Sequence, residues 1–223
     1  MALLALAGIP VLSGRVDLPR LGAWHAELRL QGDSVPSGAV QLVWDGAPGP
    51  WQATVVPGRA GLVAPGGPVE VLVVGGAGGL GRSIAGGSYR NTSARVVLEQ
   101  LLGAAGERLS TACLASVVGR QLPRWSRQAG SAGAQVAALA ARLEVAWRVL
   151  TDGSVWLGTD SGAALALPQG HQPTDRRPTI AGVELALASP WTVPQGGAFE
   201  GRAIEHATHF LTPDRLRTDL CLA

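Results

Sequence analysis

The residues whose types and spacing come closest to a chemical motif form a glycine-rich turn, Gly75–Gly81, with the sequence GGAGGLG. The turn follows the apolar run Val69–Val74, and an apolar strand that enters such a turn is typical of dinucleotide-binding sites. In those sites, backbone amides at the start of a helix hold the phosphates of the cofactor. One function open to this chain is therefore that of an NAD(P)- or nucleotide-binding enzyme.

Three features favour a strand connector at this turn over a cofactor site. Gly86 and Gly87 interrupt the helix that should follow the turn, and about 70 residues of strand-like sequence precede it. The turn resembles that of the short-chain dehydrogenases, whose catalytic pair is Tyr-x-x-x-Lys. This chain has a single tyrosine, Tyr89, and no lysine, because all 18 of its basic residues are arginine. We predict a connector or Gly-rich hairpin without a cofactor.

A second motif, Asp160-Ser161-Gly162-Ala163, resembles the Asp-Ser/Thr-Gly-Ala turn of retroviral-type aspartic proteases. Two such aspartates must face each other to share a proton, so a single copy would require a homodimer. The flanking sequence is rich in glycine and alanine, which is typical of a plain turn. We predict a turn here.

The four histidines do not form a metal-binding pattern. His206 and His209 are three residues apart, and on a strand such side chains point to opposite faces, so they cannot chelate one ion. We expect His206 to be a hydrogen-bonded core residue and His209 to be exposed. His25 and His171 have no partner at ligand spacing, and neither Gly-x-Ser-x-Gly nor His-Glu-x-x-His occurs. The sequence predicts no catalytic, cofactor or metal site.

Two amphipathic helices and a β-hairpin, all within 92–157, are the elements with the clearest patterns. The first helix has Thr92 or Ser93 as its N-cap and Gly103 at its end, with a short β segment between it and the second helix, which follows Ser131. In the hairpin, Asp152-Gly153 supplies the positive φ of a two-residue turn. Apolar residues at helical or alternating spacing support these elements: Ala94, Val97, Leu98, Leu101, Leu102; Val136, Leu139, Ala140, Leu143; and Val145, Trp147, Val149.

Residues 1–90 are predicted to be all-β. In the segment 24–31, apolar and polar residues alternate, which indicates a sheet with one solvated face. Turn-forming residues separate the strands, and a strand about every ten residues favours a small barrel or sandwich. Pro10 and Gly14 favour a first strand and turn over a signal peptide at the start. The expected strands are Val16–Leu18, Trp24–Leu30, Ala39–Trp44, Trp51–Val56 and Val69–Val74.

The C-terminal region also has strand patterns. Residues 160–198 are expected to form strand fragments and loops, and 199–222 a hairpin with a type I turn at 212–215. On the first strand of the hairpin, we expect one face to carry Ile204, His206, Thr208 and Phe210. On the second strand, we expect one face to carry Leu216, Thr218, Leu220 and Leu222.

Composition limits the remaining possibilities. Hydrophobic residues make up 47% of the chain and charged residues 15%, which excludes a disordered chain and predicts extensive contacts with other subunits. The net charge of +2, with arginines scattered along the sequence, does not indicate nucleic-acid binding. Cys113 and Cys221 are expected to be buried free thiols, with a disulfide as the alternative. No apolar run approaches the roughly 20 residues that span a bilayer, so we expect a soluble protein, intracellular when made.

Seven tryptophans against two phenylalanines and one tyrosine are an unusual aromatic content. Six of them, Trp24, Trp44, Trp51, Trp147, Trp156 and Trp191, lie on or beside expected strands. Barrel packing or a subunit interface explains them. The alternative is a Trp-rich β binding module, such as a carbohydrate-binding domain.

In this order of elements, residues 69–157 and the C-terminal hairpin resemble the baseplate hub proteins of bacteriophage tails, the hub and late-control family that joins the tail tube to the spike. In that family an aromatic residue precedes a Thr/Ser-capped helix, as Tyr89 does here. A Leu-Pro-x-Trp-like strand and a second helix follow. The remaining matches are Trp147, Val149, Asp152, Gly153, Val155 and Gly158, and then Ile204, His206, His209, Asp214, Thr218 and Leu220. The chain is short for the family, whose larger members carry four domains.

The resemblance implies an α+β, mainly β fold with two small tail-tube-like β-barrel or sandwich domains and a two-helix αβα insert between them. The expected domains are 1–90, 91–145 and 146–223, the middle one being the insert. The function implied is structural and not enzymatic: a trimeric ring with pseudo-sixfold symmetry that adapts the hexameric tail tube to the trimeric spike and continues the central channel. Edge strands are expected to pair between subunits to close the ring.

The partners implied are further copies of the chain as a homotrimer, the tail tube protein, the spike or tip protein and other baseplate proteins. DNA would be only passing cargo, no membrane insertion is expected, and no cofactor is required. The expected location is the baseplate of the virion tail, after assembly in the host cytoplasm.

Overall fold

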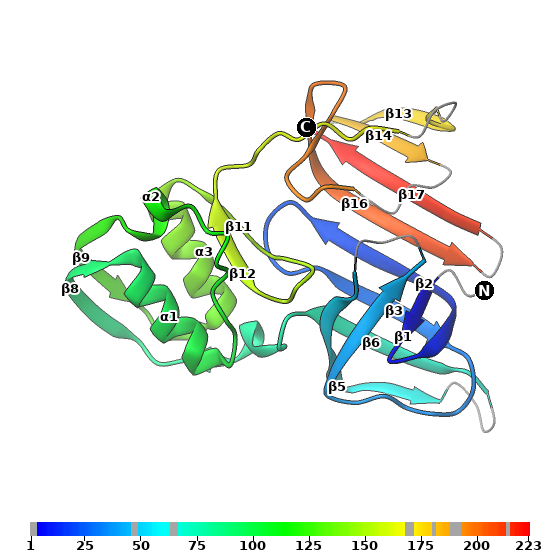
Figure 1. The fold of residues 1–223 in the computed structure, drawn as a ribbon, viewed down its shortest axis with the longest axis horizontal. Helices are drawn as coiled ribbons and strands as arrows, with labels where there is room; N and C mark the ends of the chain where they lie inside the picture. Colours follow the sequence, from blue (N-terminus) through cyan, green and yellow to red (C-terminus); the bar gives the residue numbers. More distant parts are fainter. Residues whose placement is uncertain are drawn as a thin grey trace.

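The computed structural model describes residues 4–45, 49–62, 67–167, 172–179, 182–187, 193–212 and 215–223. The N-terminal strands form a closed barrel, and the C-terminal strands form a sheet beside it (Figure 1). The helices and the short strands around them lie together at the other end of the molecule. His171, Trp191 and the centre of the predicted turn at 212–215 lie outside the described residues.

Six strands with inward-facing apolar residues form the barrel. They follow the order β1-β4-β5-β6-β3-β2, and β2 pairs back with β1, so that the strands close into a barrel. In the core, the ring of Trp51 lies 5.2 Å from that of Trp24 and 5.4 Å from that of Trp44, measured between centroids. The strands are β1 (Leu4–Leu6), β2 (Ile9–Pro19), β3 (His25–Leu30), β4 (Ala39–Trp44), β5 (Trp51–Leu62) and β6 (Val69–Gly75).

The five strands predicted in this region are all present, and β1 is an additional one. The predicted alternation holds in 24–30, where Trp24, Ala26, Leu28 and Leu30 are buried. The first turn was misplaced. It lies at Ala7 and Gly8, both with positive φ, whereas Gly14 lies inside β2. Gly14 is required there for a different reason, because a Cβ at that position would lie 2.6 Å from the backbone oxygen of Glu27.

The C-terminal sheet is continuous with the barrel. Strand β2 pairs with β16 from His206↔Pro19 to Leu211↔Gly14, and the sheet continues through β17 and β14 to β13, with β15 pairing off the path to β16. The two β regions therefore share one unbroken backbone hydrogen-bond ladder. The strands are β13 (Asp175–Thr179), β14 (Gly182–Leu187), β15 (Ala198–Phe199), β16 (Arg202–Thr212) and β17 (Arg215–Leu222).

The helical end contains the two predicted helices, α1 (Ala94–Ala105) and α3 (Ala132–Leu143), and a short third one, α2 (Ala115–Val118). The side chains of Ser93 and Ser131 cap α1 and α3, as predicted. The predicted end of α1 at Gly103 is wrong, because the helix continues for two residues and ends at Gly106 in the left-handed conformation. Strand β8 (Gly87–Ser93) precedes α1 and strand β9 (Gln121–Arg127) follows α2, and the two pair as a two-stranded ribbon. This end also contains η1 (Gly79–Gly81) and the pair of β7 (Ser83–Ile84) with β10 (Gly130–Ser131).

The hairpin after α3 pairs β11 (Ala146–Val149) with β12 (Val155–Gly158), as predicted. Its turn differs from the predicted two-residue type. The amide of Gly153 donates to Leu150 O and the amide of Leu150 to Ser154 O, which encloses three residues. Only Gly153 has positive φ among them, so the loop is a turn completed by one left-handed glycine.

The predicted fold class is confirmed: an α+β, mainly β chain with a helical insert between two β regions. Both cysteines are free thiols, with Cys113 buried and Cys221 half-buried. The predicted domain division at 1–90, 91–145 and 146–223 stays a prediction.

Candidate functional site

The glycine-rich turn already holds an anion of the protein itself. The buried carboxylate of Glu107 accepts hydrogen bonds from the amides of Ala77 (3.0 Å) and Gly79 (2.7 Å). These are the kind of backbone donors that would hold a cofactor phosphate. A phosphate at this position would have to displace Glu107 and would meet its negative charge.

The glycines of the turn are needed for close packing. A Cβ on Gly79 would lie 1.9 Å from the backbone oxygen of Ala105, and one on Gly75 would lie 2.4 Å from the indole nitrogen of Trp24. No long helix follows the turn; it leads into η1 and then β7. These contacts account for the glycines by packing between the barrel and α1, in agreement with the connector that the sequence favoured.

Removing this carboxylate is expected to destabilise the fold. Glu107→Ala leaves the buried amide of Gly79 and the partly exposed amide of Ala77 without their acceptor. An unsatisfied buried donor costs about 1–3 kcal/mol, and the Ala77 amide can bond to water instead, so we expect a loss of about 1–3 kcal/mol in the free energy of unfolding. Urea unfolding followed by tryptophan fluorescence measures it. Glu99→Ala, an exposed glutamate on α1, is the matched control and should change the free energy by less than about 0.5 kcal/mol. Equal effects of the two changes would contradict the structural role of Glu107.

Asp160, the aspartate of the protease-like motif, belongs to an ionic cluster. Its carboxylate pairs with Arg148 and with Arg20, whose Nε lies 2.7 Å away, and Arg20 also pairs with Glu205. The Arg148 side chain is 3% exposed, and its guanidinium lies over the ring of Trp156 at 4.5 Å. Burial, together with the charge of Arg20, lowers the pKa of Arg148 to about 10. Two guanidiniums surround this carboxylate, whereas a protease aspartate would face a second carboxylate.

The cluster joins the three parts of the molecule. Arg20 follows β2 of the barrel, Arg148 lies on β11, Asp160 follows β12, and Glu205 lies on β16. No room remains beside it, because a Cβ on Gly196 would lie 2.3 Å from Asp160 Oδ1. The arrangement fixes the relative positions of these elements.

The predicted positions of two histidines are reversed. His209 is 0% exposed and His206 is partly exposed, whereas the sequence placed His206 in the core and His209 outside. The cause is a bulge in β16, where the pairing register with β17 shifts between Ile204 and His206. One extra residue moves every later side chain to the other face. Ala207, His209 and Leu211 therefore point inward, and Thr208 and Phe210 point outward.

The exposed face of the continuous sheet carries a cluster around Asp17, which is 5% exposed. His206 Nε2 lies 3.1 Å from its carboxylate, Thr208 donates at 2.8 Å, Arg15 Nε lies 2.7 Å away, and His25 Nε2 lies 3.4 Å away. Burial raises the pKa of Asp17, but the hydrogen bonds from His206 and Thr208 and the charge of Arg15 outweigh it, so the pKa is lowered. Three strands, β2, β3 and β16, contribute to this cluster.

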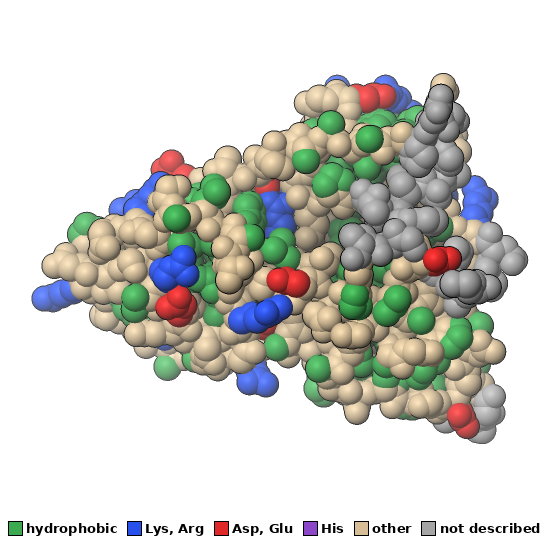
Figure 2. All heavy atoms as spheres, viewed as in Figure 1, with side chains coloured by type: hydrophobic (Ala, Val, Ile, Leu, Met, Phe, Trp, Pro, Cys, Tyr) green, Lys and Arg blue, Asp and Glu red, His purple; other side chains and the backbone are tan. Residues whose placement is uncertain are grey.

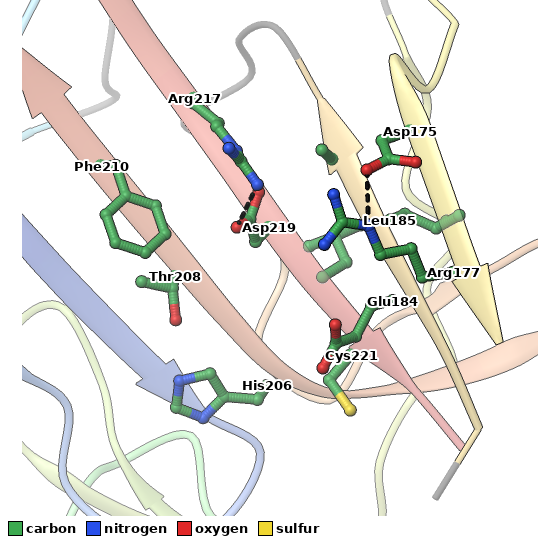
Figure 3. Close-up of a pocket in the computed structure, with 12 residues that line it drawn as sticks. Asp175, Arg177, Glu184, Leu185, His206, Thr208, Phe210, Arg217, Asp219 and Cys221 are labelled. Atoms are coloured by element: carbon green, nitrogen blue, oxygen red, sulfur yellow. Dashed lines mark hydrogen bonds and ion pairs between the residues drawn. The ribbon is translucent and has the colours of Figure 1, made fainter. Parts of the chain in front are cut away.

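A shallow groove of about 240 Å³ lies on the same face, over β16, β17, β14 and β13 (Figure 3). Four of its charges form two pairs: Arg217 Nε lies 2.7 Å from Asp219, and Arg177 Nε lies 2.8 Å from Asp175. Glu184 also lines the groove. Phe210, 39% exposed, adds an apolar side chain. The described residues contain no group of three His, Cys, Asp or Glu side chains that could hold a metal ion. The groove and the Asp17 cluster lie on one face of the sheet, and we take this face as the candidate functional site.

Sequence reasoning missed the ionic residues that matter most. Asp17 and Arg148 each lie between apolar neighbours, in Val16-Asp17-Leu18 and Trp147-Arg148-Val149. A charge inside an apolar strand is a signal that it has a buried partner. The partners themselves are distant in sequence and carry no local signal.

The chain matches no known protein-family model, and no curated protein matches it. Solved structures do match. The 43 kDa tail protein of prophage MuSo2 from Shewanella oneidensis has a TM-score of 0.68 and 12% identity over 99% of this chain and 97% of its own. A tail protein from Neisseria meningitidis MC58 has a TM-score of 0.65 and 12% identity over 98% and 95%.

A third match is a component of the type VI secretion system of E. coli, described as structurally similar to the bacteriophage T4 tail proteins gp27 and gp5. Its TM-score is 0.70 with 12% identity over 99% of this chain and 76% of its own. At this identity the likeness shows a shared fold. No helix within the described ranges has the length and apolar character needed to cross a membrane.

Proposed function

We propose that the chain is a structural hub protein of a phage tail or a related injection machine, and that it works as a ring-forming adaptor and not as an enzyme. The observation that carries the proposal is the unbroken sheet from β6 through β3, β2, β16, β17 and β14 to β13, which joins two β regions and leaves one polar face uncovered. Tail proteins of two bacteria and a type VI secretion component have the same fold.

In the proposed ring the polar face of the sheet lines the central channel. A trimer supplies two β regions from each subunit, which gives six repeats around the axis to match a hexameric tube, while the trimer itself matches a threefold spike. The charge pairs Arg217–Asp219 and Arg177–Asp175 leave this face hydrated yet close to neutral, so passing DNA is not retained. The partners are then the tail tube protein, the spike protein and other baseplate proteins, within the virion tail.

Two strand edges are available to close the ring. Within the described residues β13 pairs only with β14, and β5 pairs with β4 only as far as Thr54, so its later part has a free edge. Unpaired edges are ready templates for strands of another chain. We assign the subunit contact to these edges.

The test is the mass and shape of the purified protein. Light scattering should give three times the 22.8 kDa of the chain, and negative-stain images should show a ring with a lumen. The amide of Arg176 points to the same side of β13 as the nitrogen of Pro178, away from β14. Arg176→Pro removes this edge donor and should abolish the ring, whereas Arg176→Ala should keep it, with unchanged circular dichroism in both. A compact monomer at all concentrations would overturn the proposal.

A further inference from the structure

The arginines, scattered along the sequence, are unevenly distributed in the molecule. Residues 82–143, here called the basic end, carry eight arginines and two glutamates, whereas the rest of the chain carries ten arginines and 14 acidic residues. Neither glutamate is free, since Glu107 is held in the glycine turn and Glu99 pairs with Arg95. Figure 2 shows Arg side chains over this narrow end of the molecule. The basic end therefore has a net positive charge and the rest of the chain a net negative charge, which sum to the small net charge of the whole chain.

The ribbon of β8 and β9 contains two arginines in a costly arrangement. Arg90 and Arg124 are directly opposite each other, and like charges in cross-strand positions repel. Both are exposed, and neither has an ion-pair partner among the described residues. An anion from outside the chain would relieve this repulsion.

Arg127, at the end of β9, has no ion-pair partner among the described residues although it is partly buried. Its Nε and Nη1 atoms are buried without a hydrogen-bond partner in the described part of the chain, and its guanidinium lies 5.8 Å from the ring centroid of Tyr89. It lines a hollow of about 380 Å³ between β9 and α3, together with Trp125 and Ala138. Leaving these two donors buried without an acceptor is unfavourable, so an anion in the hollow would be stabilised by Arg127.

The hollow is also fixed in shape. The amide nitrogen of Gln135 donates to Ile84 O at 3.1 Å and to Gly130 O at 3.0 Å, which holds this side chain on the wall and leaves its oxygen free to accept. A carboxylate matches the planar fork of a guanidinium through two parallel hydrogen bonds. The half-open hollow of about 380 Å³ has room for an Asp or Glu side chain.

We propose that the basic end binds an acidic segment of another protein chain, with one Asp or Glu carboxylate in the hollow paired to Arg127. Arg90 and Arg124 attract the segment at longer range. This inference gives the chemistry of one neighbour in the proposed assembly, and the titration below measures it whether or not the chain forms a ring.

The experiment is a fluorescence-anisotropy titration of the whole protein with a short labelled peptide of alternating glutamate and serine. Arg127→Gln should weaken binding about tenfold or more, and Arg127→Lys should fall between it and the native protein. Arg29→Gln, which removes an equal charge from an exposed position on β3, is the matched control and should change affinity less than about twofold. The double change Arg90→Gln and Arg124→Gln should mainly slow association and reduce its salt dependence. Thermal unfolding verifies that each variant is folded.

Several results would overturn the proposal. They are the absence of saturable peptide binding, equal effects of Arg127→Gln and Arg29→Gln, and tighter binding of single-stranded DNA of equal charge. Self-association that depends on Arg127, measured by light scattering without peptide, would assign the hollow to a second copy and would also contradict it. None of these results depends on a lumen or on pairing of edge strands. A failure of the acidic-segment proposal can therefore be distinguished from a failure of the ring proposal.

Discussion

Replacing Asp160 by asparagine is expected to lower the free energy of unfolding by about 3–5 kcal/mol, because a buried guanidinium then loses its counter-ion. The Arg148 side chain is 3% exposed and cannot reach solvent, and its remaining neighbour in the cluster is the positive charge of Arg20. Stacking on Trp156 does not replace a carboxylate, since a cation–π contact contributes about 0.5–2 kcal/mol.

Asp219→Asn is the matched control for this change. It removes the same charge from the pair with Arg217, but these side chains are 49% and 32% exposed, and pairs that solvent reaches contribute about 0–1 kcal/mol. Urea unfolding of the two variants and the native chain gives the comparison. A second variant, Asp160→Asn with Arg148→Met, removes the uncompensated charge and should recover part of the loss. A loss of less than about 1 kcal/mol in Asp160→Asn would contradict the role of this cluster.

The cluster matters for function because it joins parts that no single hydrogen-bond ladder connects. The barrel and the C-terminal sheet share the β2–β16 pairing, but the helical end is held to them through β11, β12 and the contacts of Asp160 and Glu107. In a ring built on the continuous sheet, these contacts set the angle at which the helical end projects. Weakening them is therefore expected to affect assembly as well as stability.

Local patterns were enough to predict most elements of this fold. The alternation in 24–31 gave the buried face of β3, and the serines before the two apolar stripes gave the caps of α1 and α3. In these segments the side chains that determine the structure are neighbours along the chain. The glycine turn was expected to be a connector, and it does link β6 to η1 and β7.

Longer-range features could not be predicted from such patterns. The bulge in β16 has no local signature, and it reversed the expected positions of His206 and His209. Closure of the barrel pairs Leu4 with Trp44, and the pairing of β2 with β16 joins segments nearly 200 residues apart. The Asp17 cluster and the Glu107 carboxylate in the glycine turn also bring together residues that are distant in sequence, so local patterns could not predict them.

The bulge also leads to a pH dependence that centres on His209. Its Nδ1 lies 2.7 Å from Thr218 Oγ1, and its ring lies against Trp44 with centroids 5.4 Å apart. Burial lowers the pKa of His209 from 6.5 to about 4, although the charge of Asp17 acts in the opposite direction. The unfolded chain thus binds a proton near pH 6.5 that the folded chain does not accept until about pH 4.

We therefore expect the stabilising contribution of neutral His209 to be complete above about pH 6.5 and to be lost as the pH falls from there to about 4. The loss at pH 4 amounts to about 3 kcal/mol, at about 1.4 kcal/mol for each unit of pKa difference. Urea unfolding across this pH range measures it, and His209→Gln should flatten the dependence because it removes the proton-binding site. His206→Gln, a change at the half-exposed histidine on the opposite face, should leave the slope in place. If the free energy of unfolding of His209→Gln still falls between pH 6.5 and 4 as in the native chain, other groups cause the dependence. That result would contradict a neutral, buried His209 on the inner face of β16.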